Sequence, residues 1–354
     1  MRQWYAACVN VPHNRLTFGE EEVQAVSDVV RSGQWAGGPQ VLELEAALCA
    51  RAGVKHAVGV GSGLSALRLA LQGLGVKQGD EVIVPGYSCV ALANAPLALG
   101  AIPVPVDVHV DDFTIDPKSV RSHVNSKTKA IVVVHTFGSP SPVDELRDLK
   151  IPLIEDCAHA FGMKPLGGRG DAAILSFYAT KLMGAGRGGA VLTNQSDVAD
   201  VVRSFRWYND EPADARRHND PMTNIDAALT LSQLKRLDTM LKARRRVAEK
   251  YEQKLRPIAS NVFSLPDFKE ERVWYRYVLT MKSPSAKKMV DALKKHGVHA
   301  ECPVTDWLPK NAKELPVTRR AFDSVVSLPC YPTLTEGEQE TVCAAVESAL
   351  KEIA

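Results

Sequence analysis

Short apolar runs alternate with helix-like segments along the first half of the chain, and this alternation constrains the fold more than any other feature. The runs are hydrophobic throughout, as in Val82-Ile-Val84 and Ile131-Val-Val-Val134. Strands of this kind are buried on both faces, because the helices that connect parallel strands cover both sides of the sheet. We therefore predict an α/β fold with a mainly parallel central sheet flanked by helices. Its predicted strands lie at residues 57–60, 82–85, 102–106, 130–135, 153–155, 172–175 and 190–193.

The second half of the chain predicts a separate, smaller unit. A heptad-like apolar pattern runs from Met222 to about Leu255, which is long enough for a helix that bridges two domains. Strands are predicted after it at 274–281 and 325–328, and helices at 286–296 and 336–353. We expect a large domain at residues 1–241, which includes an N-terminal helical segment, and a small C-terminal α+β domain at residues 242–354.

Two helices are predicted before the first strand. Thr17-Phe-Gly-Glu20 has the spacing of a capping box and opens a helix that Ser32-Gly33 ends. Between the helices, a glycine-rich loop carries Trp35, which either connects them or closes over a ligand. The second helix ends at Gly53, and its predicted apolar side consists of Val41, Leu42, Leu44, Ala47 and Leu48.

The charge and the cysteines argue against several classes of protein. A net charge of +2 gives no general attraction to nucleic acid or to an acidic membrane, and no apolar stretch approaches the length of a membrane helix. The seven cysteines include no C-x-x-C pair, so neither a disulfide framework nor a zinc site is indicated. The N-terminal apolar run is too short for a signal peptide. We expect a cytoplasmic protein with no metal centre that binds neither nucleic acid nor membrane.

A lysine stands in a glycine-rich turn directly after a predicted buried strand. The strand at 172–175 leads to Ser176 and then to Lys181, and four glycines follow by Gly189. A lysine that is partly desolvated at a strand end loses its proton more easily and forms Schiff bases with carbonyl compounds. A surface lysine flanked by turn glycines gives the same pattern, so this segment alone leaves both interpretations open.

Asp156 follows another predicted buried strand. An aspartate in this position often caps the next helix. Strand ends are also where open α/β sheets bind ligands, and a buried carboxylate there needs a cationic partner. Pyridoxal phosphate requires a lysine that carries it as an imine and an acid that keeps its ring nitrogen protonated. Lys181 and Asp156 fit these two roles.

A third predicted strand turns straight into a helix through Gly61-Ser-Gly63. The backbone N–H groups of Ser62, Gly63 and Leu64 would be unpaired there, at the positive end of the helix dipole, so the turn can hold a phosphate. Many α/β proteins use such glycines only to turn tightly. The turn is therefore a weak signal by itself.

Eight motifs in order along the chain point to one family. They are Gly37-Gly-Pro39, Ser62-Gly63 with Ala66-Leu67, Gly79-Asp-Glu-Val-Ile-Val-Pro85, Thr128-Lys-Ala-Ile131, Glu155-Asp156-x-Ala-His-Ala160, Ser176-Phe177-x-x-x-Lys181, Gln233-Leu-Lys-Arg-Leu237 and Ser327-Leu-Pro-x-Tyr-Pro332. With this set, the chain resembles the pyridoxal phosphate-dependent sugar aminotransferases of the DegT/StrS type over nearly its whole length. The resemblance implies a fold-type I transferase of the aspartate aminotransferase superfamily.

The resemblance also assigns roles to single residues. Lys181 is implied to carry the cofactor, Asp156 to bind the pyridine nitrogen, and His159 to lie beside the ring's phenolic oxygen. The alternative for His159 is a core histidine that only satisfies a backbone carbonyl. By resemblance the phosphate is held by Ser176 and the Ser62-Gly63-Leu64 turn, and Trp35, Tyr178 and Arg187 lie on loops near the substrate.

Asn219 matches an asparagine that in relatives reaches the phosphate from the neighbouring subunit, which implies a homodimer with shared sites. A polar stretch from Trp207 to Pro221 is long for a connection and supports a subunit-contacting loop. The chain departs from the family pattern at Leu64 (usually threonine), Cys89 (commonly an aromatic ring stacked on the cofactor), Arg187 (commonly glutamate) and Pro221 (often arginine). These departures bear on the substrate more than on the cofactor.

The resemblance implies a ping-pong aminotransferase. Its amino donor would be an amino acid, by resemblance L-glutamate, and its acceptor a nucleotide-linked 3-keto or 4-keto deoxysugar in the biosynthesis of cell-surface polysaccharides or natural-product sugars. Two alternatives stay open. Related sugar dehydratases have histidine in place of the lysine, and Lys181 argues against that activity. A pyridoxal phosphate-binding regulator on the same fold is favoured by Leu64, Cys89 and Arg187 and disfavoured by Lys181 and Asp156.

Overall fold

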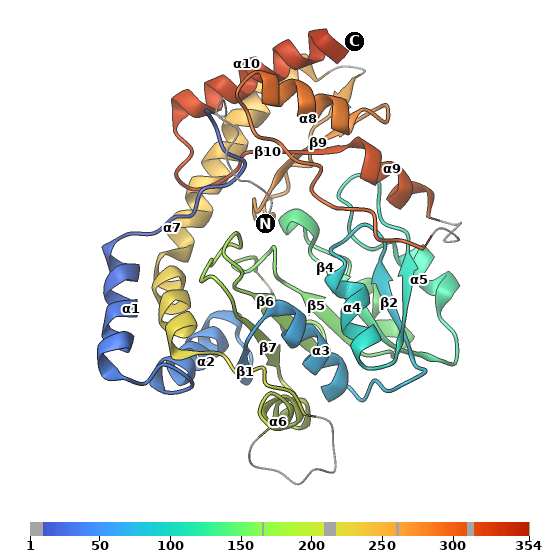
Figure 1. Ribbon diagram of the computed structural model, residues 1–354. Coiled ribbons are helices and arrows are strands. Elements are labelled where there is room, and N and C mark those ends of the chain that lie inside the picture. The colour runs from blue at the N-terminus through green and yellow to red at the C-terminus, as the bar shows by residue number, and fades with distance from the viewer. Residues whose placement is uncertain (1–9, 165, 209–216, 260–261, 310–314, 354) are drawn as a thin grey trace.

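Seven strands form one sheet at the centre of the molecule (Figure 1). The computed structural model describes residues 10–164, 166–208, 217–259, 262–309 and 315–353. In the order β1-β7-β6-β5-β4-β2-β3, only β7 runs antiparallel to its neighbours, so the predicted mainly parallel sheet is confirmed. Its strands are β1 (His56–Val60), β2 (Glu81–Pro85), β3 (Ile102–Val106), β4 (Thr128–Val134), β5 (Leu153–Asp156), β6 (Ala172–Ser176) and β7 (Gly189–Thr193).

The central strands send alternate side chains into two cores. Val82 and Val84 of β2 pack with Leu67 of a covering helix on one face, and Ile83 packs with Ile131 on the other. Each such side chain contributes roughly 1.5–3 kcal/mol when fully buried. The helices around the sheet are α1 (Glu20–Ser32), α2 (Pro39–Ala52), α3 (Gly63–Gly73), α4 (Ala91–Ala98), α5 (Pro117–His123) and α6 (Ser196–Phe205), with short 3-10 helices η1 (Thr136–Gly138) and η2 (Asp144–Leu149).

A long helix, α7 (Asn224–Leu255), connects the large sheet to a smaller unit (Figure 1). Val11, near the start of the described residues, packs into the core of that unit and pairs with Val298, so this segment lies against the second half of the chain. α7 passes the predicted domain boundary near residue 242 without a break, and the boundary stays a prediction. The smaller unit consists of η3 (Arg256–Ile258), the antiparallel strands β8 (Phe263–Ser264), β9 (Tyr277–Met281) and β10 (Val325–Leu328), and the helices α8 (Ala286–Lys295), α9 (Pro316–Ser324) and α10 (Glu336–Ile353).

Several details of the sequence prediction were wrong. The capping box at Thr17 is misplaced by two residues, because α1 begins at Glu20 and the backbone N–H of Gly19 donates to the carboxylate of Glu22 at 2.7 Å. Leu42 does not belong to the buried side of α2, since 65% of it is exposed. The strand expected from residue 274 begins at Tyr277, and α5, α9 and β8 were not predicted.

In the described part of the chain, we find no helix with the length and apolar character needed to cross a bilayer. Of the polar loop predicted from Trp207 to Pro221, residues 209–216 lie outside the described ranges. The described residues at its end contain no helix or strand before α7 begins, but Pro221 forms an isolated bridge with Val60.

Candidate active site

The ends of two neighbouring parallel strands bring Asp156 and Lys181 to the same edge of the sheet. Asp156 is the last residue of β5, and β6 beside it ends at Ser176. Lys181 lies in the loop that joins β6 to the antiparallel β7. The backbone closes this loop at its base, where the N–H of Phe177 donates to the carbonyl of Gly188 at 2.9 Å. Parallel strands place ligand-binding groups at their carboxyl ends, and this edge is where the predicted site assembles.

The amine of Lys181 has no ion-pair or hydrogen-bond partner among the described residues. Its Nζ lies 5.1 Å from the centroid of the Tyr275 ring, which holds a cation by the charge distribution of its π face. Burial opposes ionisation of Tyr275, but the charges of Lys181 and Arg276 outweigh burial and lower the pKa of its phenol. An amine that packs on an aromatic ring without a counter-ion is placed to react with a ligand rather than to stabilise the fold.

The carboxyl group of Asp156 is partly satisfied by the protein. Its Oδ1 accepts the backbone N–H of Ala158 at 2.9 Å, and no salt bridge to it is found among the described residues. Burial raises the pKa of this carboxyl, although the Ala158 N–H and the charge of Lys181 act in the opposite direction. A cationic ligand group beside Asp156 would offset the cost of keeping it ionised.

His159 lies between two aromatic rings. Its ring stacks on Tyr275, with centroids 4.2 Å apart, and faces Phe137 at 6.2 Å. Burial lowers the pKa of His159 well below its usual value, and the charges of Lys181 and Arg276 act in the same direction, so the imidazole stays neutral. Its Nδ1 is buried without a hydrogen-bond partner in the described residues, which leaves that atom to a ligand.

The start of α3 lies directly against Ser176. A Cβ added at Gly63 would be 2.7 Å from the Cβ of Ser176, so only glycine permits this approach. The hydroxyl of Ser62 accepts the N–H of Ser65 at 3.0 Å and caps α3. The Ser176 hydroxyl and the helix start thus form a small cup that fits a phosphate. Leu64 contributes no hydroxyl to it.

Behind this cup, Asp220 ties the end of the polar loop to α3. Its carboxylate accepts the hydroxyl of Ser65 at 2.8 Å and pairs with Arg68, and its carbonyl accepts the N–H of Gly61 at 2.7 Å. The neighbouring Asn219 is exposed. Its contact with a second subunit is not tested by the single chain and stays a prediction.

The remaining predicted residues are spread around the site. Cys89 and Arg187 are exposed, and Tyr178 is 58% exposed with its N–H directed at the Ser176 hydroxyl at 3.5 Å. The indole N–H of Trp35 donates to the carbonyl of Val30 at 3.1 Å, which holds the ring on α1. The backbone N–H of Lys181 donates to the carbonyl of Tyr178 at 2.8 Å, but among the described residues no side-chain contact joins these four residues to Lys181. Their substrate and cofactor roles stay predictions.

A buried polar cluster lies beside Asp156 in the sheet, at the end of β4 and in β5. The backbone N–H of Ser141 donates to Nδ1 of His135 at 3.1 Å, so Nε2 carries the proton and donates to Glu155 at 3.2 Å. Glu155 also accepts the backbone N–H groups of Arg169 and Gly170. Cys157 lies close enough to form a three-residue metal set with His135 and Glu155, but these hydrogen bonds already use the carboxylate and both imidazole nitrogens.

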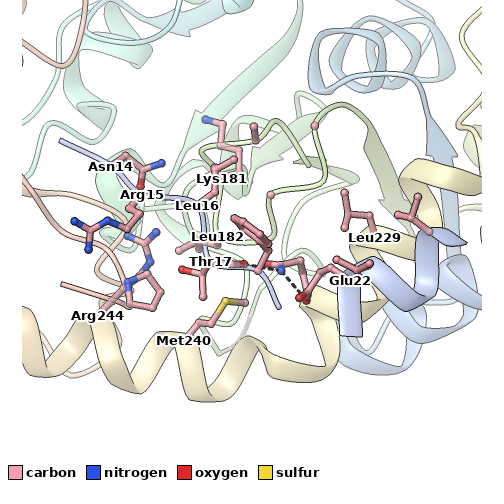
Figure 2. Close-up of a pocket in the computed structure, with 18 of the residues that line it drawn as sticks. Asn14, Arg15, Leu16, Thr17, Glu22, Lys181, Leu182, Leu229, Met240 and Arg244 are labelled. Carbon is pink, nitrogen blue, oxygen red and sulfur yellow. Dashed lines mark hydrogen bonds between the residues drawn. The ribbon is translucent and has the colours of Figure 1, made fainter. Parts of the chain in front are cut away.

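A cavity of about 520 Å³ borders Lys181 but not Asp156 or His159 (Figure 2). It lies between the N-terminal residues 14–18, α1, α7 and the lysine loop. In Figure 2 the amine of Lys181 points away from Leu182 and Met240. The cavity therefore lies behind the lysine, and the reactive edge is the one shared by Asp156, His159 and the α3 start.

Sequence reasoning missed Tyr275 and Arg276. They directly precede β9, and only the folded chain brings them to Lys181 and His159. The only available signal was an aromatic residue followed by a charged residue at the start of an apolar strand pattern. Such a pair is common in strands that take no part in catalysis, so it does not single out a site.

Within the described residues, a lysine amine without an ion-pair partner, a buried carboxylate, a neutral imidazole with an unused nitrogen and a helix start beside a serine hydroxyl fit pyridoxal phosphate. On the mainly parallel sheet, this arrangement defines a fold-type I pyridoxal phosphate-dependent transferase. The chain belongs to the DegT/DnrJ/EryC1/StrS aminotransferase family, whose model matches residues 17–347. It is a pyridoxal phosphate-dependent sugar aminotransferase by family.

Solved structures of similar proteins support this family assignment. The aminotransferase TlmJ from Streptoalloteichus hindustanus is 29% identical, with a TM-score of 0.89 over 98% of this chain and 99% of that one. NtdA from Bacillus subtilis, solved with bound cofactor PMP, is 26% identical, with a TM-score of 0.89 over 97% and 88%. DesV from S. venezuelae, solved with a ketimine intermediate, is 31% identical, with a TM-score of 0.86 over 93% and 94%.

Proposed function

We propose that this enzyme transfers the amino group of L-glutamate to the carbonyl carbon of a nucleotide-linked 3-keto or 4-keto deoxysugar. The observation that carries the proposal is the amine of Lys181 on the Tyr275 ring, near the buried carboxylate of Asp156, with no ion pair to either group among the described residues. An amine without a counter-ion in a protein interior is the group that transamination requires.

Two groups of this chain serve proton transfer. When bound, pyridoxal phosphate supplies a carbonyl for imine formation and a ring that accepts the electron pair of a deprotonated carbon. Asp156 holds a proton at the ring nitrogen, because its buried carboxylate is stabilised by that positive charge. The amine of Lys181 removes the proton from the α-carbon of the donor and delivers a proton to the sugar carbon in the second half-reaction.

The other residues orient the reacting groups. Neutral His159, fixed between Phe137 and Tyr275, offers Nδ1 to a polar atom of the cofactor ring. The cup of Ser176 and the α3 start binds the phosphate by a hydroxyl and backbone N–H groups. Exposed Tyr178 and Arg187 lie on the lysine loop, where an incoming sugar nucleotide would meet them.

We further propose a homodimer in the cytoplasm. Asn219 is exposed beside Asp220, which anchors the loop at the phosphate cup, so a second chain placed there would extend the cup. Six cysteines in the described part of the chain are free thiols, and free thiols suit a reducing compartment. The proposed pathways are those that build amino sugars for cell-surface polysaccharides or natural products.

A pyridoxal phosphate-dependent sugar dehydratase is the second candidate, and retention of Lys181 disfavours it. A cofactor-binding regulator is the third. Both differ from an aminotransferase in how an amino acid affects the bound cofactor. We expect L-glutamate to remove the visible absorption band of the purified, cofactor-loaded enzyme and a keto-sugar to restore it. A band that persists with every amino acid tested would rule out transamination. A mass-spectrometric screen of nucleotide-linked 3-keto and 4-keto sugars would then identify the acceptor.

A further inference from the structure

Arg276 lies beside the reactive lysine and has no part in the chemistry above. Its guanidinium carbon is 5.5 Å from the centroid of the Tyr275 ring, the same ring against which the amine of Lys181 lies at 5.1 Å. Its positive charge acts on His159 and Tyr275, and it also acts on Tyr87 in the loop after β2. Arg276 therefore faces the reactive edge, although it belongs to the smaller unit.

One edge of this guanidinium is held in a fixed position. Its Nη1 lies 3.0 Å from Nε2 of His13, 3.3 Å from the hydroxyl of Ser327 and 3.6 Å from Glu301. Arginine has no acceptor, so Nε2 of His13 accepts and the imidazole proton sits on Nδ1, which donates to Glu301 at 3.2 Å. Burial lowers the pKa of His13 well below its usual value, so it stays neutral and able to accept.

The other edge of the guanidinium is available. Among the described residues, Nε and Nη2 of Arg276 form no hydrogen bond, and the side chain keeps 19% of its exposure. Two nearby arginines serve the fold instead. Arg244 donates to the carbonyls of Tyr275 and Cys330, and Arg272 stacks on Trp274. A guanidinium that is oriented on one edge and open on the other presents a two-donor fork to a planar anion.

We propose that Arg276 binds the α-carboxylate of the amino-acid donor. This inference rests on the proposed function and specifies how its donor is recognised. Every α-amino acid carries a carboxylate on the carbon that loses a proton to Lys181, so the carboxylate must lie next to that lysine. Arg276 is the open guanidinium that shares a ring with Lys181 in the described structure.

The nucleotide diphosphate of the acceptor is a poorer match for the same group. A whole sugar ring or its glycosidic link separates the diphosphate from the carbonyl carbon that reacts at Lys181. A cation packed on the same side chain as the lysine therefore lies nearer to the reacting carbon than to any phosphate. The open fork also matches the two coplanar oxygens of a carboxylate.

The test compares two donors in the first half-reaction, followed by the absorbance of the bound cofactor. The donors are L-glutamate and its α-amide, which replaces only the α-carboxylate. The variants are Arg276→Met, Arg276→Lys and, as a matched control, Arg256→Met, which removes an exposed arginine that pairs with Glu252 at the end of α7. Thermal unfolding and cofactor content are measured for each variant.

We expect Arg276→Met to lower the second-order rate constant for L-glutamate by about a hundredfold or more, because one partner of a desolvated charge pair is lost. The rate with the α-amide should stay within about twofold of wild type. With L-glutamate, the rate constant of Arg276→Lys should lie between those of wild type and Arg276→Met, since lysine keeps the charge and loses the two-donor fork. Should Arg276→Met not fold, the same selective loss for L-glutamate in Arg276→Lys carries the test.

Equal losses for both donors, no loss with L-glutamate, or a loss confined to the sugar half-reaction would each overturn the assignment. These outcomes are distinct from a failure of the proposed function. If none of the amino acids tested converts the cofactor of the wild-type enzyme, the proposed function is wrong and this inference is wrong with it. If the wild type reacts and Arg276→Met reacts equally well, only the role of Arg276 is wrong.

Discussion

The two sides of the active site are built in different ways. Lys181, Asp156 and the phosphate cup follow directly from strand ends of the large sheet, so strand register fixes their positions. Tyr275 and Arg276 come from the smaller unit, and Arg276 is held by His13, which is 263 residues away in the sequence. We propose that the first side, the sheet side, has the groups that every reaction of the cofactor needs. The second side, the distant side, has the groups that we expect to select the substrate. Its assembly depends on contacts between distant parts of the chain.

The strongest test of the sheet side is Lys181→Ala. We expect turnover to disappear while the protein stays folded and binds pyridoxal phosphate without a covalent bond, because only an amine forms the imine and moves the proton. Borohydride reduction followed by peptide mapping checks this. Recovery of the reduced cofactor on another lysine in the wild type would remove Lys181 from its role.

Asp156→Asn tests the same side at the ring nitrogen. We expect the rate of donor deprotonation to fall by about three orders of magnitude or more, with a smaller loss of cofactor affinity, because a neutral amide no longer stabilises a proton on the ring. Single-turnover kinetics with L-glutamate measure the rate. A mutant that deprotonates the donor at nearly the normal rate would show that Asp156 is not the partner of the ring.

Asn219 tests whether one chain contains a complete site. Lys181→Ala and Asn219→Asp, which places a carboxylate against the phosphate, should each be inactive alone. In a mixed heterodimer, one site carries both changes and the other carries neither, so the mixture should regain up to half of the wild-type activity per heterodimer. No regain, with heterodimers shown to form, would mean that Asn219 serves its own chain or no site.

Gly63→Ala measures how closely the cup depends on the contact between α3 and Ser176. The added Cβ would lie 2.7 Å from the Cβ of Ser176, and overpacking of this kind costs about 1–3 kcal/mol. We expect the Kd for pyridoxal phosphate to rise about tenfold, equivalent to about 1.4 kcal/mol. Gly337→Ala in α10 is the control, because outside its own helical turn no atom of a described residue lies within 4 Å of its added Cβ. Equal Kd values for the two variants would contradict the close contact.

His13→Asn gives the smallest effect and tests the distant side. Burial lowers the pKa of His13, so the unfolded chain binds a proton at higher pH than the folded one. The stability that neutral His13 provides is therefore complete above a pH of about 6.5 and is lost as the pH falls below it. Melting temperatures from about pH 7 to about pH 5 should fall more steeply for wild type than for His13→Asn. The pKa of His159 is lowered in both proteins, so its effect on the pH dependence of the melting temperature cancels in the comparison. Parallel curves would contradict the buried neutral imidazole.

The strands of the sheet side could be predicted from the sequence, whereas the residues of the distant side could not. A buried apolar run followed by Asp156 or Lys181 predicts a strand and a candidate site at its end. The strands are confirmed, and the roles of the two residues stay predictions. Leu42 was wrongly assigned to the buried side of α2. A periodic pattern shows which residues share one side of a helix, but not which residues at the edge of that side are covered by neighbouring elements. Tyr275 and Arg276 acquire a role only through their packing on Lys181 and His159, which no local pattern records. Cys89, Trp35, Tyr178, Arg187 and Asn219 stay predictions.

The pairing of β1 with β7 has a consequence for the order in which the protein folds during its synthesis. Residues of β1 pair with β7, as Val60 does with Gly189, so the edge strand that leads into the phosphate cup has no neighbour until the ribosome has added about 130 more residues. The lysine loop, in contrast, joins two strands that are adjacent along the chain and can close locally. A nascent chain therefore contains the cup residues early but forms the cup late. Cofactor capture must wait until β7 has emerged, and donor selection by Arg276 until the smaller unit has folded.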